Sequence, residues 1–265
     1  MLRRDRAFDG RFVTGVLTTG IYCRPSCGAR HPKRENVRFF RDGNGARSIG
    51  LRACKRCLPD DVARDETAVL KAVEKICSST RLPALSSLAS YVGYSPAHFL
   101  RIFKRATGLS PRIFAKAVRH ERAIAYLALE KKIIDAVYES GWVTPSRFYA
   151  DMSTRLGMTP TAWRNGGSGE TICWLEADTK LGLLLVAHTQ SGICFVLPAA
   201  RYGEMMRRFS NAQIARSSSL WKARLLRAIA KANHATPGTP IPPEAQWAIF
   251  CEMLRKAFRE DPARS

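Results

Sequence analysis

The stretch TTGIYCRPSCGARHPKREN, residues 18–36, combines cysteine with many basic residues, and RACKRCLPD, residues 52–60, repeats that combination. Together the two stretches contain four cysteines: Cys23, Cys27, Cys54 and Cys57. Two chelating pairs on loops are typical of a tetrahedral zinc site with four thiolate ligands. The spacing therefore predicts one zinc ion bound by all four sulfurs, which would stabilise a segment too small to bury a large core.

The basic surroundings of these cysteines leave two functions open. One is a closed zinc site that only folds the segment, and the other is a sulfur that does chemistry beside nucleic acid. A four-thiolate zinc centre carries a net charge of about −2, yet basic side chains surround it in the sequence: Arg24, Arg30, Lys33, Arg34, Arg52, Lys55 and Arg56. These cations would bring DNA phosphates towards sulfurs that repel them. A phosphate already methylated to a neutral triester could approach and lose its methyl group.

The composition agrees with a nucleic-acid partner. The 265 residues carry a net charge of +21, and the first 60 are the most basic for their length. An excess of this size indicates a polyanionic partner. The N-terminus MLRRDRAFDG lacks the apolar core of a signal peptide, and the apolar run LGLLLVA is too short to span a bilayer. We expect a cytoplasmic protein without a membrane partner.

A cytoplasmic location argues against disulfides and for metal-bound or catalytic thiols. Besides the four cysteines of the predicted zinc site, the chain has four more in apolar helical or strand patterns: Cys77, Cys173, Cys194 and Cys251. We interpret these as small buried hydrophobic side chains.

An internal repeat follows the cysteine-rich segment. The stretches YSPAHFLRIFKRATGLSPRIF (94–114) and VTPSRFYADMSTRLGMTPTAW (143–163) align at an offset of 49 residues. Each copy begins with a hydroxyl N-cap followed by proline, Ser95 in the first and Thr144 in the second. Each copy also follows an amphipathic segment that ends in glycine. Helix, glycine turn and capped second helix predict a helix-turn-helix motif, here present twice.

Two further helices are predicted around this repeat: a linker helix over 61–82, and a helix over about 112–129 that joins the copies. The outer faces of the capped helices are the expected contact surfaces for bases and phosphates. The candidate DNA contacts there are Ser95, His98, Arg101 and Lys104 in the first copy, and Ser146, Arg147 and Tyr149 in the second.

The cysteine motif TTGIYCRPSCGARH…REN…RACKRCLPD closely resembles the N-terminal domain of the Ada family of adaptive-response DNA-methylation repair proteins. The tandem repeat is similar to the AraC-type DNA-binding domain that follows it there. The resemblance covers residues 8–165, and the T-G-I-[FY]-C-R-P-S-C motif is specific. It implies irreversible, single-turnover transfer of a methyl group from a DNA methylphosphotriester to Cys23, with all four cysteines binding zinc.

The resemblance also implies partners and contacts. The methylated protein would activate transcription of the alkylation response, with double-stranded DNA and RNA polymerase as partners. By the resemblance, Thr19 and Arg30 fall at positions near the DNA phosphate. Three basic residues around the second cysteine pair are further expected DNA contacts: Arg52, Lys55 and Arg56. The sequence departs from the family at Gly28, where arginine is common, and at Ala53, where proline is usual. Both changes could weaken DNA contact without touching the ligands.

The last hundred residues resemble the family only weakly. Full-length Ada proteins carry a second acceptor cysteine in a Pro-Cys-His-Arg motif of an O6-alkylguanine domain. Residues 170–198 are similar to the opening strands of that domain, but the motif is absent, and Cys251 lies in the helical pattern WAIFCEMLRKAF. We expect a truncated or divergent ribonuclease-H-like segment without O6-methylguanine activity. Its role is open between a remnant fold, a docking surface and an unstable stub.

The expected architecture is an α+β multidomain protein with three parts. Residues 1–64 would form a small zinc-stapled α/β domain, 65–165 an all-α double helix-turn-helix domain of the AraC type, and 170–265 the partial ribonuclease-H-like α/β segment. Two rival functions remain. One is an AraC-type transcription regulator with a purely structural zinc site, and the other is a defective relative with neither activity.

Overall fold

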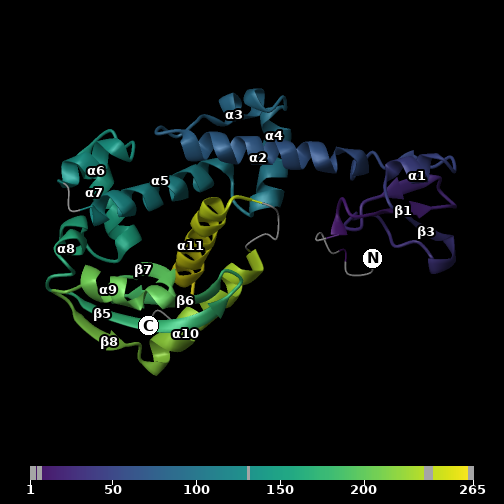
Figure 1. Ribbon diagram of the computed structural model, residues 1–265. Coiled ribbons are helices and arrows are strands. Elements are labelled where there is room, and N and C mark those ends of the chain that lie inside the picture. The colour runs from purple at the N-terminus through teal and green to yellow at the C-terminus, as the bar shows by residue number, and fades with distance from the viewer. Residues whose placement is uncertain (1–3, 5–7, 130–131, 236–240, 262–265) are drawn as a thin grey trace. The chain divides into compact units, whose positions relative to one another are not determined.

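The computed structural model describes Arg4 and residues 8–129, 132–235 and 241–261 (Figure 1). The chain forms two compact units, Met1–Lys71 (unit 1) and Ala72–Ser265 (unit 2). Helix α2 (Val62–Ser78) contains the boundary between them and confirms the predicted linker helix. The protein is a mixed α+β structure, as predicted. None of the helices in the described ranges combines the length and the apolar composition needed to cross a bilayer.

Unit 1 is built on a four-stranded sheet with the strand order β3-β1-β2-β4. Its strands are β1 (Val13–Val16), β2 (Ile21–Cys23), β3 (Val37–Phe40) and β4 (Arg52–Ala53). Strand β1 runs antiparallel to β2 and β3, whereas β4 runs parallel to β2. The short helices are η2 (Arg34–Asn36), α1 (Gly43–Arg47) and η3 (Pro59–Asp61).

The hydrophobic core of unit 1 is small. In the described part of the unit, the buried cluster consists of Val13, Tyr22, Ala46 and Leu51. The Tyr22 hydroxyl donates a hydrogen bond of 2.7 Å to Asp60. Burial, followed by this contact, raises the pKa of Tyr22 to about 12. A core of this size gives little hydrophobic stabilisation, so the fold of unit 1 requires a further cross-link.

Unit 2 begins with the two predicted helix-turn-helix motifs. The first motif consists of α3 and α4 and the second of α6 and α7, and α5 joins them as the predicted continuous helix. The bounds are α3 (Leu85–Tyr91), α4 (Pro96–Thr107), α5 (Pro111–Ala128), α6 (Ile133–Glu139), α7 (Pro145–Leu156) and α8 (Pro160–Arg164). The repeat in the sequence thus corresponds to a repeat in the structure.

The ends of α4 and α7 follow from local sequence. The Ser95 hydroxyl accepts a hydrogen bond of 3.4 Å from the backbone N–H of His98 and caps α4. Thr144 occupies the same position before α7 but makes no side-chain capping bond. Both helices end at a left-handed glycine, Gly108 with φ +75° and Gly157 with φ +62°, a conformation that residues with a Cβ rarely adopt.

The rest of unit 2 is a mixed sheet with the order β7-β6-β5-β8 and three α-helices. The predicted strands are confirmed as β5 (Thr171–Thr179), β6 (Gly182–His188) and β7 (Ile193–Pro198). The helices that follow are α9 (Tyr202–Arg208), α10 (Ser219–Ala235) and α11 (Pro243–Arg259), with a short η4 (Ala199–Arg201) before α9. Helix α11 contains the predicted helical pattern around Cys251. Strand β8 (Gln213–Arg216), parallel to β5, was not predicted.

Both faces of this sheet are covered, because alternate residues of β6 belong to different cores. Leu185 and Ala187 lie in the cluster that contains the second helix-turn-helix motif and α9. Leu184 and Val186 lie in the cluster formed with α10 and α11. A strand buried on both faces has a nearly continuous apolar sequence, which explains the run LGLLLVA. Figure 1 shows α11 extending from the sheet towards α5, and these two helices are in contact.

Candidate metal centre and nucleic-acid interface

The four predicted zinc ligands come together in unit 1. Their sulfur atoms all lie within 4.8 Å of one another. The parallel pairing of β2 with β4, which sets Tyr22 opposite Ala53, brings the next residues, Cys23 and Cys54, side by side. The other two sulfurs come from the following loops, at Cys27 and Cys57. Residues 31 positions apart therefore meet through strand register, and each pair is completed by a local turn.

Backbone contacts hold both turns. The N–H of Cys27 donates 3.1 Å to the carbonyl of Arg24, and the N–H of Leu58 donates 2.9 Å to the carbonyl of Cys54. The N–H of Arg24 donates 3.3 Å to the sulfur of Cys57, which links the two turns. In metal sites, hydrogen bonds from groups that do not bind the metal orient the ligands, and this N–H would orient the Cys57 sulfur.

Arg24 has a different role from the one that its sequence context predicted. We expected it among the basic residues near DNA phosphates, but its side chain is buried. It donates hydrogen bonds of 3.2 and 2.6 Å to the carbonyl of Leu58 and lies 3.7 Å from Asp65. Arg24 therefore fixes the loop after Cys57 and is unavailable to solvent.

The acidity of the thiols tests whether the cluster suits a metal. The hydrogen bond with Cys57, followed by burial, raises the pKa of the Cys23 thiol well above its ordinary value. The same hydrogen bond lowers the pKa of the Cys57 thiol to about 6, while burial raises the pKa of Cys27. The close packing of the thiols therefore opposes loss of the proton from Cys23, and a bound cation would reverse this.

Zinc fits this set of donors. Tetrahedral thiolates at about 2.3 Å from zinc lie about 3.8 Å from one another, and the four sulfurs are already within 4.8 Å. Four soft sulfur donors select zinc over the hard cations magnesium and calcium. The residues that would hold the ion are Cys23, Cys27, Cys54 and Cys57.

The four thiols differ in access. A small cavity of about 40 Å³ adjoins the cluster, and both Cys23 and Cys27 line it, together with Thr14 and Arg30. Cys54 is buried, and neither it nor Cys57 lines this cavity. A small group could therefore approach the cluster from the side of the first cysteine pair.

The other candidate contacts of unit 1 lie at its surface. Thr19, in the turn between β1 and β2, is exposed, and its hydroxyl donates 3.3 Å to the carbonyl of Val16. The predicted basic contacts are all exposed: Arg30, Arg52, Lys55 and Arg56. The same segments that supply the sulfurs thus present cations to solvent.

The candidate contacts of the first helix-turn-helix motif lie along α4. Ser95, Arg101 and Lys104 are exposed. His98 is half-buried, and its ring stacks on Tyr94 with 4.8 Å between the ring centroids. Arg101 and Lys104 therefore remain the side chains best placed for a polyanion, and His98 is held against its neighbour.

In the second motif the candidates lie at the start of α7. Ser146 and Arg147 are exposed, whereas Tyr149 is half-buried with its hydroxyl 3.3 Å from that of Thr161. Asp151 faces back towards the protein, where it pairs with Lys116 at 3.1 Å. The charge of α7 that is available to a partner is thus concentrated in its first turn.

The remaining cysteines are partly as predicted. Cys194 and Cys251 are buried, and burial raises the pKa of each thiol to about 12. Cys77 and Cys173 are only half-buried, so the prediction that all four are core residues needs correction.

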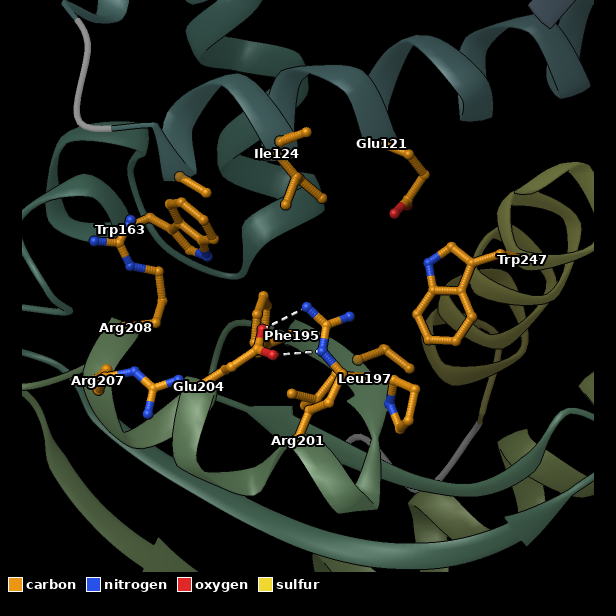
Figure 2. Close-up of a pocket in the computed structure, with 14 residues that line it drawn as sticks. Glu121, Ile124, Trp163, Phe195, Leu197, Arg201, Glu204, Arg207, Arg208 and Trp247 are labelled. Carbon is orange, nitrogen blue, oxygen red and sulfur yellow. Dashed lines mark hydrogen bonds and ion pairs between the residues drawn. The ribbon is translucent and has the colours of Figure 1, made fainter. Parts of the chain in front are cut away.

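A larger cavity of about 690 Å³ lies in unit 2 between α5, α8, β7, α9 and α11. Figure 2 shows the ion pair between Arg201 and Glu204 on the wall of this cavity. Arg201 pairs with Glu204 at 2.5 Å, and the guanidinium of Arg208 lies 4.9 Å from the ring centroid of Trp163. Glu121 pairs with two buried arginines. The charged side chains named here therefore make contacts within the protein.

Sequence reasoning missed those two arginines, Arg155 and Arg255, as residues of importance. A signal was present, since Arg155 follows Phe148 and Met152 at the spacing of the inner face of α7. A charged residue at such a position indicates a buried partner.

Fold and site together define a class: a zinc-binding protein that contacts DNA through two helix-turn-helix motifs. A family profile described as the metal binding domain of Ada matches residues 1–60, and one described as a helix-turn-helix domain matches residues 88–166. The bifunctional transcriptional activator/DNA repair enzyme Ada of Escherichia coli (strain K12) is 33% identical over 272 aligned positions, covering 99% of this chain and 76% of that protein. The chain belongs to the Ada family.

A further relative and a solved structure match shorter stretches of the chain. The bifunctional transcriptional activator/DNA repair enzyme AdaA of Bacillus subtilis (strain 168) is 30% identical over 167 positions, covering 62% of this chain and 79% of that protein. A solved NMR structure of the E. coli Ada protein in complex with DNA is 42% identical, covers 46% of this chain and 88% of that chain, and has a TM-score of 0.38.

Proposed function

We propose that this protein repairs methylphosphotriesters in DNA by taking the methyl group onto Cys23, and that methylation converts it into a transcriptional activator of the alkylation response. The observation that carries the proposal is the cluster of four sulfurs within 4.8 Å in a strongly basic unit, with Cys23 lining a cavity. The relatives named above are DNA repair enzymes and transcriptional activators, which supports both halves.

The transfer needs no redox partner. The Cys23 sulfur attacks the methyl carbon of the triester, a carbon–sulfur bond forms, and the carbon–oxygen bond to phosphate breaks. The phosphate diester leaves with the electron pair as an anion. Bound zinc would keep the four sulfurs deprotonated at neutral pH. Because a thioether is not readily cleaved, each molecule acts once.

The exposed cations of unit 1, Arg30, Arg52, Lys55 and Arg56, would gather the phosphate backbone around the cluster. The thiolate charge repels ordinary phosphates, whereas a neutral triester escapes that repulsion. Cys54 is buried and is suited to a ligand role alone. Cys27 also lines the cavity, and Cys23 is distinguished from it by the family motif directly before it.

The proposal assigns roles along the chain. Residues 1–64 are the acceptor domain and 65–165 the double helix-turn-helix domain that binds promoter DNA, with Arg101, Lys104 and Arg147 as the main contacts. RNA polymerase is the proposed partner in activation, and the cytoplasm is the proposed compartment. Residues 170–265 are proposed to be ribonuclease-H-like. An antiparallel meander, β5 to β7, with β8 added parallel to β5 supports this assignment.

Methylation would act as an electrostatic switch, and Cys23→Met mimics it with a neutral thioether. One negative charge near a phosphate is removed, so repulsion of about 1–4 kcal/mol at contact distance disappears. We expect Cys23→Met to bind DNA about tenfold more tightly at low salt than the unmodified protein, with the difference shrinking as salt rises. Titration of labelled duplex DNA across a salt series measures this.

The matched control for the switch is Cys77→Met, the same change at a half-buried cysteine outside the cluster. It should leave DNA affinity unchanged. Equal affinities for unmodified, methylated and Cys23→Met protein at every salt concentration would show that the switch is not electrostatic. The rival function, a regulator with a purely structural zinc site, predicts that the unmodified protein takes up no methyl group and that Cys23→Met does not bind DNA more tightly than the unmodified protein.

No guanine repair is expected from this chain. Cys251, which lies in the C-terminal region, is 1% exposed, and burial raises the pKa of its thiol to about 12. Reactive cysteines are accessible thiolates. We expect duplex DNA containing O6-methylguanine to keep its methyl group in the presence of excess protein, as measured by nucleoside analysis. Transfer of that methyl group to Cys251 would contradict the assignment.

A further inference from the structure

The end of the second recognition helix, α7, lies against the C-terminal region of the chain. We infer that residues 171–235 and 241–261 act as a clamp that holds α7 in its DNA-binding orientation, and thus work as part of the DNA-binding module. The inference rests on the DNA binding proposed above. It gives a function to a region that carries no repair cysteine of its own.

Buried charge forms the first part of the clamp. Arg155 of α7 is 2% exposed at its side chain, and its guanidinium pairs with Glu121 of α5 at 2.8 Å and with Glu252 of α11. Arg255 of α11 pairs with the same Glu121 at 3.5 Å. Burial by itself lowers the pKa of Arg155, but Glu121 and Glu252 more than offset this, and the pKa is raised. Arg155 therefore stays charged, and removing a carboxylate would leave a buried charge uncompensated.

The backbone at the end of α7 forms the second part. The carbonyl of Gly157, the C-cap, accepts a hydrogen bond of 2.5 Å from the buried hydroxyl of Thr189, in the turn between β6 and β7. A Cβ placed on Gly157 would lie 2.6 Å from the carbonyl oxygen of Gly192 in the same turn. The β6–β7 turn is therefore in direct contact with the helix end.

A shared core forms the third part. Met152 and Leu156 of α7 are fully buried in the same hydrophobic cluster as Leu185, Cys194 and Leu197 of the sheet. Strand β7 and helix α7 are in contact. A helix with its inner face, its terminal carbonyl and its buried arginine all held by one neighbouring region cannot tilt independently of that region.

The first recognition helix, α4, ends differently from α7. Ala106 stands at the position equivalent to Arg155, offset by 49 residues. The hydroxyl of Thr107 donates hydrogen bonds to the carbonyls of Phe103 at 2.9 Å and Leu109 at 3.0 Å, so this end is closed by its own motif. The C-cap Gly108 is exposed, whereas Gly157 is buried. The two copies therefore differ at the C-terminal ends of their second helices.

The first test uses two full-length variants, Glu252→Gln and Thr189→Val. Thr189→Val removes one hydroxyl and keeps the shape of the side chain. We expect both variants to accelerate hydrogen exchange of the α7 amides about tenfold or more, with the α4 amides unchanged as an internal control. Glu260→Gln is the matched control, because it removes an exposed carboxylate from the end of the same helix. It should leave α7 unchanged.

The second test is DNA affinity. The two clamp variants should bind duplex DNA about tenfold more weakly with the salt slope unchanged, because they lose orientation and no phosphate contact. Arg101→Ala, a contact variant, should instead make the slope shallower by about one and leave α7 exchange unaltered. Coupling is reciprocal, so DNA should also slow exchange in residues 189–193 of the wild-type protein.

Unchanged α7 exchange in both variants would overturn the clamp, and so would loosened α7 exchange with unaltered DNA affinity. If Glu252→Gln loses its structure throughout the protein, the Thr189→Val variant alone tests the clamp. If the wild-type protein binds no DNA, the proposed function fails, and the exchange measurement still reports whether the C-terminal region holds α7.

Discussion

Incubation with DNA that carries methylphosphotriesters is expected to add one methyl group to each molecule of this protein, on Cys23. The reason is the combination of access and position. Cys23 lines the cavity beside the cluster, at the end of β2, whereas Cys54 is buried. Intact mass measures the stoichiometry, and mapping of peptides from the treated protein places the methyl group without any variant.

Variants at Cys23 test directly whether this residue is the acceptor. Cys23→Ser and Cys23→Met should take up no methyl group, a change from one per molecule to none, and Cys77→Ala should take up one like the wild type. Circular dichroism of each variant checks that the fold is kept. A methyl group found on Cys27 would show that Cys27, which lines the same cavity, is the acceptor in place of Cys23. A protein with no methyl group on any cysteine would favour the purely structural zinc site.

Removal of the metal is expected to unfold unit 1 and to leave unit 2 intact. In the described part of unit 1 the hydrophobic cluster contains four residues, which is too few to stabilise a sheet alone. Structural zinc contributes about 10–16 kcal/mol to the folding of small domains at neutral pH. A strong chelator should therefore abolish the protection of the β1 to β4 amides from hydrogen exchange.

The chain offers an internal control for this experiment. Its five tryptophans all follow residue 71, so their fluorescence reports on unit 2 alone. The fluorescence should stay unchanged when the metal is removed. Native mass spectrometry should show one zinc per chain before chelation. A metal-free protein that keeps the amides of β1 to β4 protected would contradict the structural role of the cluster.

Much of the fold could be predicted because its signals are local. Ser95 and Thr144 each precede a proline, and the helices that follow begin where predicted, although only Ser95 makes a side-chain capping bond. The strands β5 to β7 follow from apolar runs separated by turns. Strand β8 could not be predicted in this way, because four residues with little alternation become a strand only by pairing with β5.

Some features of the candidate site could also be predicted from local sequence, and others could not. Strand register brings Cys23 and Cys54 together, but their spacing in the sequence already predicted a shared metal. The surface position of Arg101 and Arg147 followed from helical periodicity. The half-buried state of His98 and Tyr149 did not, because it depends on the rings and hydroxyls of Tyr94 and Thr161.

The sequence by itself determined the four-cysteine cluster and the two helix-turn-helix motifs, because paired cysteines, prolines at helix starts and helical periodicity are patterns of residues close together in the chain. Only the tertiary structure decided the roles of Arg24 and Arg155. Both are arginines in a strongly basic chain, yet one holds the loop carbonyl of Leu58 and the other is buried against Glu252. A guanidinium is buried only where acceptors meet it, and Glu252 lies 97 residues from Arg155 in sequence.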